Sequence, residues 1–248
     1  MHHIEIKLLN PQVALEAEQT LVAAARLTQH GHSVTNLDDF LKLYNNPYSP
    51  TLVQKLCKLP HPTLQKFGVL NIIIVGASRR FLAQITRHQN EVKFMSASLQ
   101  YSDMTGRDDF VVPYSLLDKP EELKLYLESN REQLTSYEEL VRSNPGSHDE
   151  AAYLLPQCMR NTLLISATPY QWKHMIKQRV CRRNSPETRY VMLRCWEALY
   201  EVAPALFDDI AVPCQNKGCE EGSMSCGNPI AKHSTVMDII AQDFPLLW

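Results

Sequence analysis

Glycine is scarce in this sequence, with only 8 among 248 residues. No stretch fits G-x-G-x-x-G or G-x-x-x-x-G-K, the glycine-rich loops with which many proteins bind the phosphates of dinucleotides and nucleoside triphosphates. The common Rossmann and P-loop classes of nucleotide-binding protein are therefore not indicated.

A long apolar run and an excess of charge of one sign are also missing. No run approaches the roughly 20 residues that span a bilayer, and the N-terminus, MHHIEIKLLN, has no hydrophobic region of a signal peptide. The 25 Lys and Arg residues nearly balance 27 Asp and Glu, giving a net charge of −2 and no global basic field for nucleic acid. We therefore expect a cytoplasmic protein with no membrane and no nucleic-acid partner.

The seven cysteines are odd in number and follow no secretion signal, which favours reduced thiols over a disulfide framework. Three of them have C-x4-C-x6-C spacing near the C-terminus, at Cys214, Cys219 and Cys226. With Cys181 or His233 they could complete a tetrahedral zinc site. The spacing is not that of a standard zinc finger, so we favour free thiols and predict no metal site.

The remaining composition is that of an ordinary globular protein, with 44% apolar and 21% charged residues. Nothing resembles a flexible linker. We predict a single domain over residues 1–248, with an irregular, cysteine-containing segment, 213–248, packed on it.

Local signals predict a helix-rich chain. Proline at the first helical position marks four helix starts, at Pro11, Pro50, Pro169 and Pro186. We expect a helix over 79–88 capped by Ser78, and a long helix over 119–143 capped by Asp118. Ser147 and Glu150 form a capping-box pattern ahead of a further helix. The β-branched run NIIIV, residues 71–75, is the best strand candidate. The fold class is therefore α+β, with a small antiparallel or mixed sheet.

One polar segment, QITRHQNEVKFMSASLQY at 84–101, is the best candidate for a site. If the helix runs to residue 88, Gln84, Arg87 and His88 share one face at i, i+3 and i+4. A solvated face is the ordinary explanation for any single Arg or His. The cluster, followed closely by Ser98 and Tyr101, favours a binding site instead.

QITRHQ followed by SASLQYS resembles the signature of the flavin-dependent thymidylate synthases, the ThyX family. Four further blocks resemble the family in the same order along the chain: LPHPTLQKF, QRVCRRNSPETRY, EVAPALF and GCEEGSMSCG. The resemblance spans roughly residues 55–228. Because several separate blocks keep their order, it is more specific than any one of them.

The resemblance implies a ThyX-like fold and function. The family moves a methylene group from a folate to C5 of dUMP and reduces it with a flavin hydride, so the implied cofactor is FAD. Methylenetetrahydrofolate and NADPH are the implied co-substrates, and a pyrimidine nucleoside monophosphate is the implied acceptor. The implied assembly is a homotetramer whose active sites are built from several subunits.

Residue by residue, the resemblance assigns three sets. The catalytic set is Arg179, Ser98 and His61. The cofactor-binding set is Arg87, His88, Gln89, His174 and Asn184. The substrate-binding set is Gln84, Ser98, Gln100, Tyr101 and Arg179.

In the family, the arginine at position 179 holds the carbonyl and imide edge of the pyrimidine. Ser98 is interpreted as a nucleotide-binding hydroxyl and His61 as a flavin-side histidine, while Glu187 and Arg189 fit an E-x-R pattern. Simpler explanations stay open: Arg179 could complement a helix dipole, Ser98 could be a loop hydroxyl, and His61 an exposed turn residue.

Three positions depart from the family pattern. Gln89, Gln100 and Ala152 stand where the family has arginine, so each loses a permanent cation. The candidates to compensate are Arg160, Lys93 and Arg183. Two alternatives follow: a relative that methylates or hydroxymethylates another pyrimidine nucleotide, of the UMP or dCMP type, or a non-catalytic nucleotide-binding paralogue.

Overall fold

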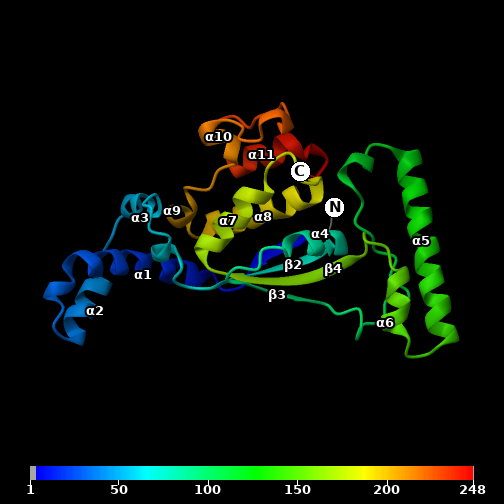
Figure 1. The fold of residues 1–248 in the computed structure, drawn as a ribbon, viewed down its shortest axis with the longest axis horizontal. Helices are drawn as coiled ribbons and strands as arrows, with labels where there is room; N and C mark the ends of the chain where they lie inside the picture. The colour runs from blue at the N-terminus through cyan, green and yellow to red at the C-terminus, as the bar shows by residue number, and fades with distance from the viewer. Residues whose placement is uncertain (1–3, 248) are drawn as a thin grey trace.

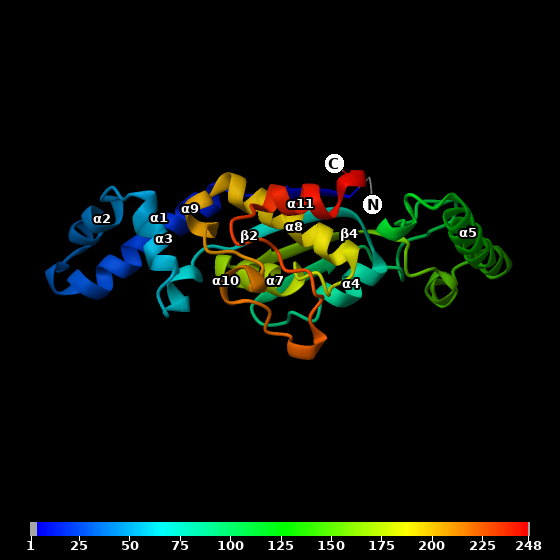
Figure 2. The same ribbon diagram turned by 90° about the horizontal axis from the view of Figure 1, so that it is seen from above.

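The computed structural model describes residues 4–247, so residues 1–3 and 248 of the predicted 1–248 domain lie outside the described residues. The molecule is elongated, with a central sheet between two helical ends (Figure 1). Helices α1 (Pro11–His30) and α2 (Leu37–Asn45) form one end, and α5 (Pro120–Ser143) forms the other. The view from above shows the same separation (Figure 2).

The sheet has four strands, β1 (Glu5–Leu8), β2 (Leu70–Ser78), β3 (Val92–Ser96) and β4 (Arg160–Ala167). Their order is β1-β2-β4-β3, and every neighbouring pair is antiparallel. The predicted strand at 71–75 lies within β2. The predicted α+β fold with a small sheet is confirmed, and the sheet is antiparallel rather than mixed.

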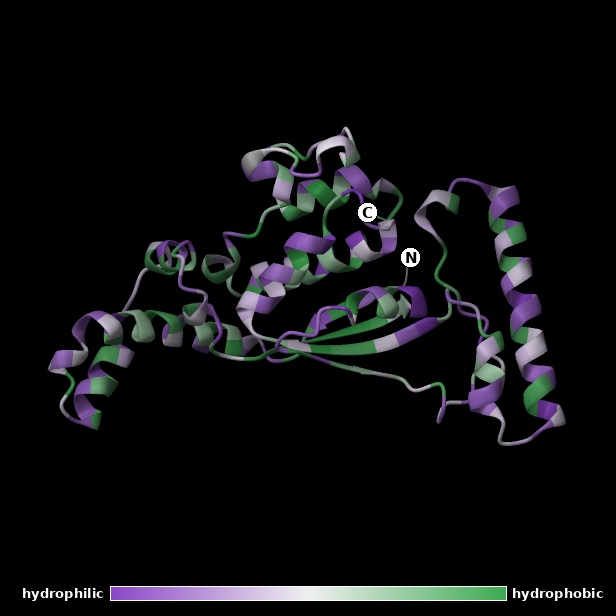
Figure 3. Cartoon of the chain, viewed as in Figure 1, coloured by the Kyte–Doolittle hydropathy of each residue, from purple (hydrophilic) through white to green (hydrophobic). Residues whose placement is uncertain are grey.

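Side chains alternate across the sheet because successive residues of a strand point to opposite faces. Ile72, Ile74 and Ile165 are fully buried on one face, where they meet the helices α4 (Arg79–Ile85), α7 (Pro169–Arg179) and α8 (Pro186–Val202). Much of β2 and β4 is correspondingly green in Figure 3. On the other face, Val75 is 40% exposed and Met95 72% exposed.

The proline-marked helix starts are confirmed. Helices α1, α7, α8 and α3 (Pro50–Cys57) each have proline in the first turn. The remaining short helices are α6 (His148–Ala151), α9 (Pro204–Phe207), α10 (Pro213–Lys217) and α11 (Val236–Asp243). Single 3₁₀ turns occupy Gly31–Ser33, Pro62–Gln65, Tyr114–Leu116, Ala152–Leu154, Gly222–Met224 and Pro245–Leu247.

Helix α4 is shorter than predicted. Ser78 caps it as expected, because its Oγ accepts a hydrogen bond from the Phe81 N–H at 3.0 Å. The helix ends at Ile85, however, and His88 follows in a turn in which its N–H donates to the Ile85 carbonyl at 3.1 Å. The prediction that Gln84, Arg87 and His88 share one helical face is therefore wrong.

Two predicted caps are also wrong. The N-cap of α5 is Lys119 rather than Asp118, and it makes no side-chain bond. Ser147 donates its Oγ–H to the Asn144 carbonyl at 2.6 Å instead of forming a capping box with Glu150.

The segment predicted to be irregular from residue 213 contains α10 and α11, and α11 packs on α8 through the buried Ile239 and Ile240. Within residues 4–247, no helix has both the length and the apolar character needed to cross a membrane.

Candidate functional site

Arg179, the last residue of α7, is the centre of the candidate site. Its Nε donates to Nε2 of His88 at 2.8 Å, and its Nη2 donates to the backbone carbonyl of Gln84 at 2.9 Å. The end of α7 is thereby joined to the end of α4 and the turn after it. The fold thus brings together Gln84, His88 and Arg179. It does so although α4, which was expected to carry both Gln84 and His88, ends at a residue between them.

The cationic charge of this centre is not neutralised. Within residues 4–247, no Asp or Glu forms an ion pair with Arg179 or with Arg87. Burial, and then the neighbouring Arg87, lower the pKa of Arg179. Two cations without an acidic partner suit an anionic ligand, or negative charge that develops during a reaction.

His88 is a neutral acceptor in this arrangement. Burial, then Arg179 and His174, lower the pKa of His88 to about 4. Since its Nε2 accepts from Arg179, the proton of the neutral ring lies on Nδ1. The ring of His174 meets it edge-on, with centroids 6.1 Å apart. Near neutral pH, His88 orients the guanidinium of Arg179 without adding a positive charge.

A chain of hydroxyls fixes the side chain of Gln84. The Thr188 Oγ1 donates to Gln84 Oε1 at 2.8 Å, and the Ser185 Oγ donates to Thr188 Oγ1 at 2.8 Å. The amide oxygen of Gln84 is therefore used within the protein. Gln84 is not among the residues that line the pocket beside Arg179.

Glu187 anchors the start of α8 to the end of β2. Its carboxylate accepts from the Ser78 N–H at 2.7 Å and from the Ser78 Oγ at 2.6 Å. Burial raises the pKa of Glu187, and these bonds act against that rise. Because Ser78 also caps α4, Glu187 holds together the elements that carry Gln84 and Ser185.

A pocket of about 400 Å³ opens beside Arg179. The predicted residues that line it are Arg87, His88, Gln89, His174 and Arg179. A second pocket of about 340 Å³ adjoins it, since both are lined by Tyr170 and His174. Both linings include several hydrogen-bonding side chains.

Sequence reasoning missed Tyr170 and Gln178, which line the first pocket. A signal for them existed. Tyr170, His174 and Gln178 recur at i, i+4 and i+8 on α7, so they project from one side of the helix.

The segment after β3 does not join Arg179 within one chain. Ser98, Gln100 and Tyr101 do not line the pocket, and Tyr101 is 84% exposed. The Ser98 Oγ accepts from the Gln100 N–H at 3.2 Å. These side chains are left facing solvent or another molecule.

Two other predicted residues lie apart from the pocket lining. His61 precedes the 3₁₀ turn Pro62–Gln65 and does not line either pocket. Asn184 donates its amide to the carbonyls of Gln178 at 3.0 Å and Cys181 at 3.4 Å. In this chain its amide therefore donates to carbonyl groups at the C-terminal end of α7 and just beyond it.

The C-terminal cysteines do not form a ligand set. Among the described residues, no three His, Cys, Asp or Glu side chains are placed to hold a metal ion. The Cys214 Sγ accepts from the Ile230 N–H at 3.4 Å, and the Cys226 Sγ donates to the Asn228 carbonyl at 3.5 Å.

Comparisons with known proteins agree on one family. The family model described as thymidylate synthase complementing protein (Thy1) matches residues 11–205. The flavin-dependent thymidylate synthase of Thermococcus onnurineus is 31% identical over 147 residues, which cover 58% of this chain and 58% of that protein. The one from Pyrococcus furiosus is 25% identical over 196 residues, covering 77% of this chain and 76% of the relative. The chain thus spans less than two thirds of the Thermococcus protein.

Two solved structures share the fold. The UMP/dUMP methylase PolB from Streptomyces cacaoi, bound with 5-Br dUMP, superposes with a TM-score of 0.66 at 15% identity, covering 83% of this chain and 93% of that one. Thymidylate synthase X from Helicobacter pylori, with FAD and dUMP, gives a TM-score of 0.62 at 16% identity, covering 84% of this chain and 98% of that one.

Proposed function

Because the chain belongs to the thymidylate synthase complementing protein family, the family of flavin-dependent, methyltransferase-type thymidylate synthases, we propose that it transfers a one-carbon unit from methylenetetrahydrofolate to C5 of a pyrimidine nucleoside monophosphate. The acceptor proposed is dUMP. The observation that carries the proposal is Arg179, a half-buried cation that has no acidic partner among residues 4–247 and is oriented by hydrogen bonds to His88 and to the Gln84 carbonyl.

Arg179 has the chemistry that the reaction needs. Two of its nitrogens donate to His88 and Gln84, and Nη1, which has no hydrogen-bond acceptor among the described residues, can donate to a ligand. C5 of the pyrimidine becomes a carbon nucleophile when negative charge is shared between it and the C4 carbonyl oxygen, as in an enolate. A fixed guanidinium is a suitable donor to such a carbonyl. Arg179 therefore binds the pyrimidine edge, and the amide Nε2 of Gln84 lies on a neighbouring element.

The pocket beside Arg179 has hydrogen-bond donors that suit a flavin dinucleotide. Arg87 supplies a cation for a phosphate, while Gln89, Gln178 and His174 supply further hydrogen-bonding groups. When bound, FAD supplies the hydride that reduces the transferred carbon. NADPH is the proposed source of those electrons. Arg87 and His88 thus hold the cofactor beside the residue that orients the substrate.

The site is completed by a second copy of the chain in this proposal. Ser98, Gln100 and Tyr101 lie on an exposed loop outside the Arg179 pocket. The face of the sheet that carries Val75 and Met95 leaves apolar side chains exposed, which suits burial between subunits. We propose a homotetramer in which this loop supplies the nucleotide-binding hydroxyl of Ser98 to a neighbouring Arg179.

A second acceptor is favoured by one observation. Gln100 occupies a position where the family resemblance expects arginine, so the loop carries a neutral amide toward the nucleotide. The fold is shared with a methylase of UMP as well as dUMP. An enzyme acting on UMP or a cytosine nucleotide is therefore the alternative candidate.

Flavin binding tests the proposal. The purified protein is equilibrated with excess FAD, desalted, and examined by visible absorption. We expect retained flavin bands, with Arg87→Ala weakening retention and Arg142→Ala, a change at the far end of α5, leaving it intact. A protein that stays colourless would instead indicate the non-catalytic paralogue.

A further inference from the structure

A pocket of about 460 Å³ lies between α5 and the body of the molecule. Its volume falls within the roughly 300–1,000 Å³ of sites that bind small molecules. One wall is α5, and the others are the segment 111–115, the loop 156–158, the start of α8 and the junction of β2 with α4. It shares no lining residue with the pocket beside Arg179. A ligand bound here would therefore be additional to those of the candidate site.

The pocket lies where two parts of the fold meet. In Figures 1 and 2, α5 stands apart from the sheet and from the helices that cover it. Its buried Leu134 and Tyr137 belong to a small hydrophobic cluster that is separate from the main core. The helix packs on α6 and on the 3₁₀ turns Tyr114–Leu116 and Ala152–Leu154. Ligand pockets form preferentially at such boundaries, and a bound molecule would bridge the two parts.

The apolar part of the lining is rigid and suits a planar ring. Three of the lining residues are prolines, at positions 113, 156 and 186. Tyr126 donates its hydroxyl to the Val111 carbonyl at 2.8 Å, so this hydroxyl is satisfied within the protein. What Tyr126 can still offer to a ligand is the carbon surface of its ring, on which a planar molecule can stack.

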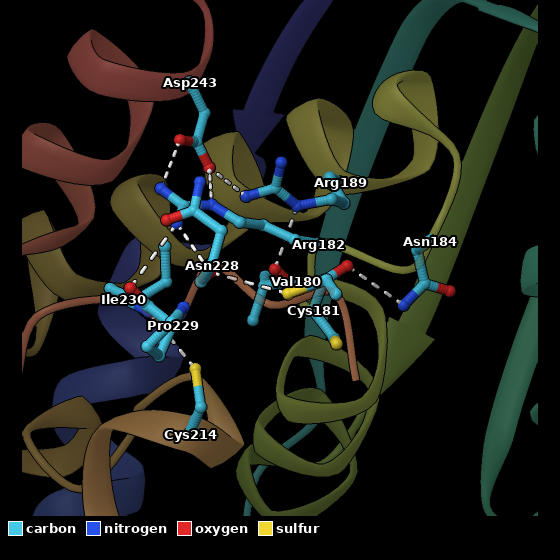
Figure 4. A network of polar contacts seen from close by, with 11 residues as sticks. Val180, Cys181, Arg182, Asn184, Arg189, Cys214, Asn228, Pro229, Ile230 and Asp243 are labelled. Atoms are coloured by element: carbon cyan, nitrogen blue, oxygen red, sulfur yellow. Dashed lines mark hydrogen bonds and ion pairs between the residues drawn. The ribbon is translucent and has the colours of Figure 1, made fainter. Parts of the chain in front are cut away.

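A second aromatic ring of the lining, Tyr114, is held by the C-terminal segment. It meets the ring of Phe244 edge-on, with centroids 5.2 Å apart. Asp243, the residue before Phe244, is fixed in turn. Its carboxylate pairs with Arg182 and Arg189 (Figure 4). The position of Tyr114 is therefore set before a ligand binds.

Some polar side chains of the lining have hydrogen-bonding groups to spare. Within residues 4–247, the side chains of Gln157 and Ser115 form no hydrogen bond. Gln133 donates its Nε2 to the Ser129 carbonyl at 3.4 Å, while its Oε1 has no donor among the described residues. A carboxamide presents a donor and an acceptor side by side, and this pair matches the edge of a nucleobase.

The formal charges of the lining balance each other. Its charged residues are one cation, Arg80, and one carboxylate, Glu187. Burial raises the pKa of Glu187, and the hydrogen bonds from Ser78 and the charge of Arg80 act against that rise. A neutral ligand therefore suits this pocket better than an anion does.

We propose that this pocket binds a nucleoside through its base, with the carboxamides of Gln133 and Gln157 on the edge of the base and the rings of Tyr114 and Tyr126 against its face. The inference goes beyond the proposed function and does not depend on it. It assigns a second nucleoside site, which requires no phosphate and lies apart from the acceptor site at Arg179.

Isothermal titration calorimetry with adenosine, inosine and uridine tests the proposal. The three bases present different edges to the two carboxamides, and none of the compounds carries a phosphate. We expect one saturable site per chain for at least one of them. Its affinity should change by less than about twofold between about 50 and 500 mM NaCl, because salt does not screen a neutral ligand. No saturable binding by any of the three would overturn the inference.

Matched variants place the bound nucleoside. Gln157 is exposed, so Gln157→Leu should fold, and it should weaken binding about three- to tenfold, the usual weight of one neutral hydrogen bond. Gln12→Leu makes the same change at an exposed position of α1 outside the lining and should leave the affinity unchanged. Arg179→Ala should also leave it unchanged, because Arg179 does not line this pocket. Melting temperatures check that the variants are folded.

Hydrogen exchange locates the ligand independently of the variants. A nucleoside that contacts α5 and the start of α8 should slow the exchange of amides in both elements and leave α1 unaffected. Slowing confined to α7 and the turn after α4 would place the nucleoside at the candidate site, against the inference.

Competition separates this inference from the proposed function. Saturating FAD should leave nucleoside binding unchanged. Displacement by FAD, loss of binding in Arg179→Ala, or equal effects of Gln12→Leu and Gln157→Leu would refute the second site and leave the flavoenzyme standing. Nucleoside binding that follows Gln157 in a protein that binds no FAD would retain the second site and refute the flavoenzyme.

Discussion

The guanidinium of Arg179 donates a 2.8 Å hydrogen bond to the imidazole of His88, which lies 91 positions earlier in the chain. The bond places a neutral ring behind a cation that has no acidic partner within the described residues. Its consequence is orientation: the arginine is held by neutral acceptors, so its charge remains available to a ligand.

Arg179→Ala should lower the rate of alkylation far more than it lowers FAD affinity. Loss of one preorganised donor to a developing charge costs about 10²–10³ in rate. Steady-state rates and FAD titrations on the same preparation measure the two effects, with Arg142→Ala as a matched exposed control. An Arg179→Ala enzyme with unchanged turnover would remove this residue from the reaction.

Mixing two inactive variants should restore activity if neighbouring copies share the site. Arg179→Ala and Ser98→Ala damage the site from opposite sides, so random assembly leaves about a quarter of the sites with both native residues. The variants are unfolded and refolded together, and turnover is compared with that of each variant treated alone. Failure to recover any activity, with tetramers formed, argues that both residues act within one chain.

His88 should make the stability of the protein depend on pH. Its pKa is lowered to about 4 in the folded protein, from an ordinary 6.5. Between these values the unfolded chain binds a proton that the native protein does not, so stability falls as the pH falls through this window. Arg179 and His174 face the ring and oppose its protonation.

Urea unfolding between pH 7 and pH 4 measures this contribution. His88→Gln should flatten the fall in unfolding free energy below pH 6.5, and the exposed His32→Gln serves as the control for losing a histidine. An unchanged slope in His88→Gln would mean that the histidine is not held neutral.

Asp243→Ala should destabilise the protein strongly. Its carboxylate is 9% exposed and serves two arginines that are 10% and 8% exposed. Removing one partner of a buried ion pair costs about 3–5 kcal/mol, because the remaining charge is left without compensation. Thermal and urea unfolding measure the change.

The matched control is Asp108→Ala, which breaks the exposed pair with Arg131. A pair of that kind contributes about 0–1 kcal/mol. Equal losses of unfolding free energy in the two variants would show that the buried ion pairs of Asp243 stabilise the protein no more than an exposed pair does.

Helix starts were readable from sequence because their signals are local. A proline fixes its own φ and needs no hydrogen-bond donor in the first turn, so Pro11, Pro50, Pro169 and Pro186 mark starts that the structure retains. The end of α4 was not readable in this way. Thr86 turns its Oγ1–H back to the Leu82 carbonyl at 2.9 Å, and His88 is then held by Arg179 from the far end of α7.

The candidate site was predictable in part for a different reason, because its residues were assigned from the family resemblance and not from local signals. Order and residue type along the chain identified Arg87, His88, Gln89, His174 and Arg179, which the fold gathers around one pocket. The separation of Ser98 and Tyr101 from that pocket depends on where β3 lies in the sheet. The position of the C-terminal segment was not predictable, because it depends on ion pairs between Asp243 and two arginines that lie far away in sequence.

Release of tritium from C5 of the substrate tests the central claim most directly. A new carbon–carbon bond at C5 requires that the hydrogen there be lost, so methylation or hydroxymethylation must liberate it. The protein is incubated with FAD, NADPH, methylenetetrahydrofolate and [5-³H]dUMP, with parallel reactions on [5-³H]UMP and [5-³H]dCMP, and tritium in water is counted over time. We predict release that depends on FAD, on the folate and on Arg179, and that is matched by formation of the C5-alkylated nucleotide. Absence of release from all three nucleotides by folded, flavin-loaded protein would contradict the account.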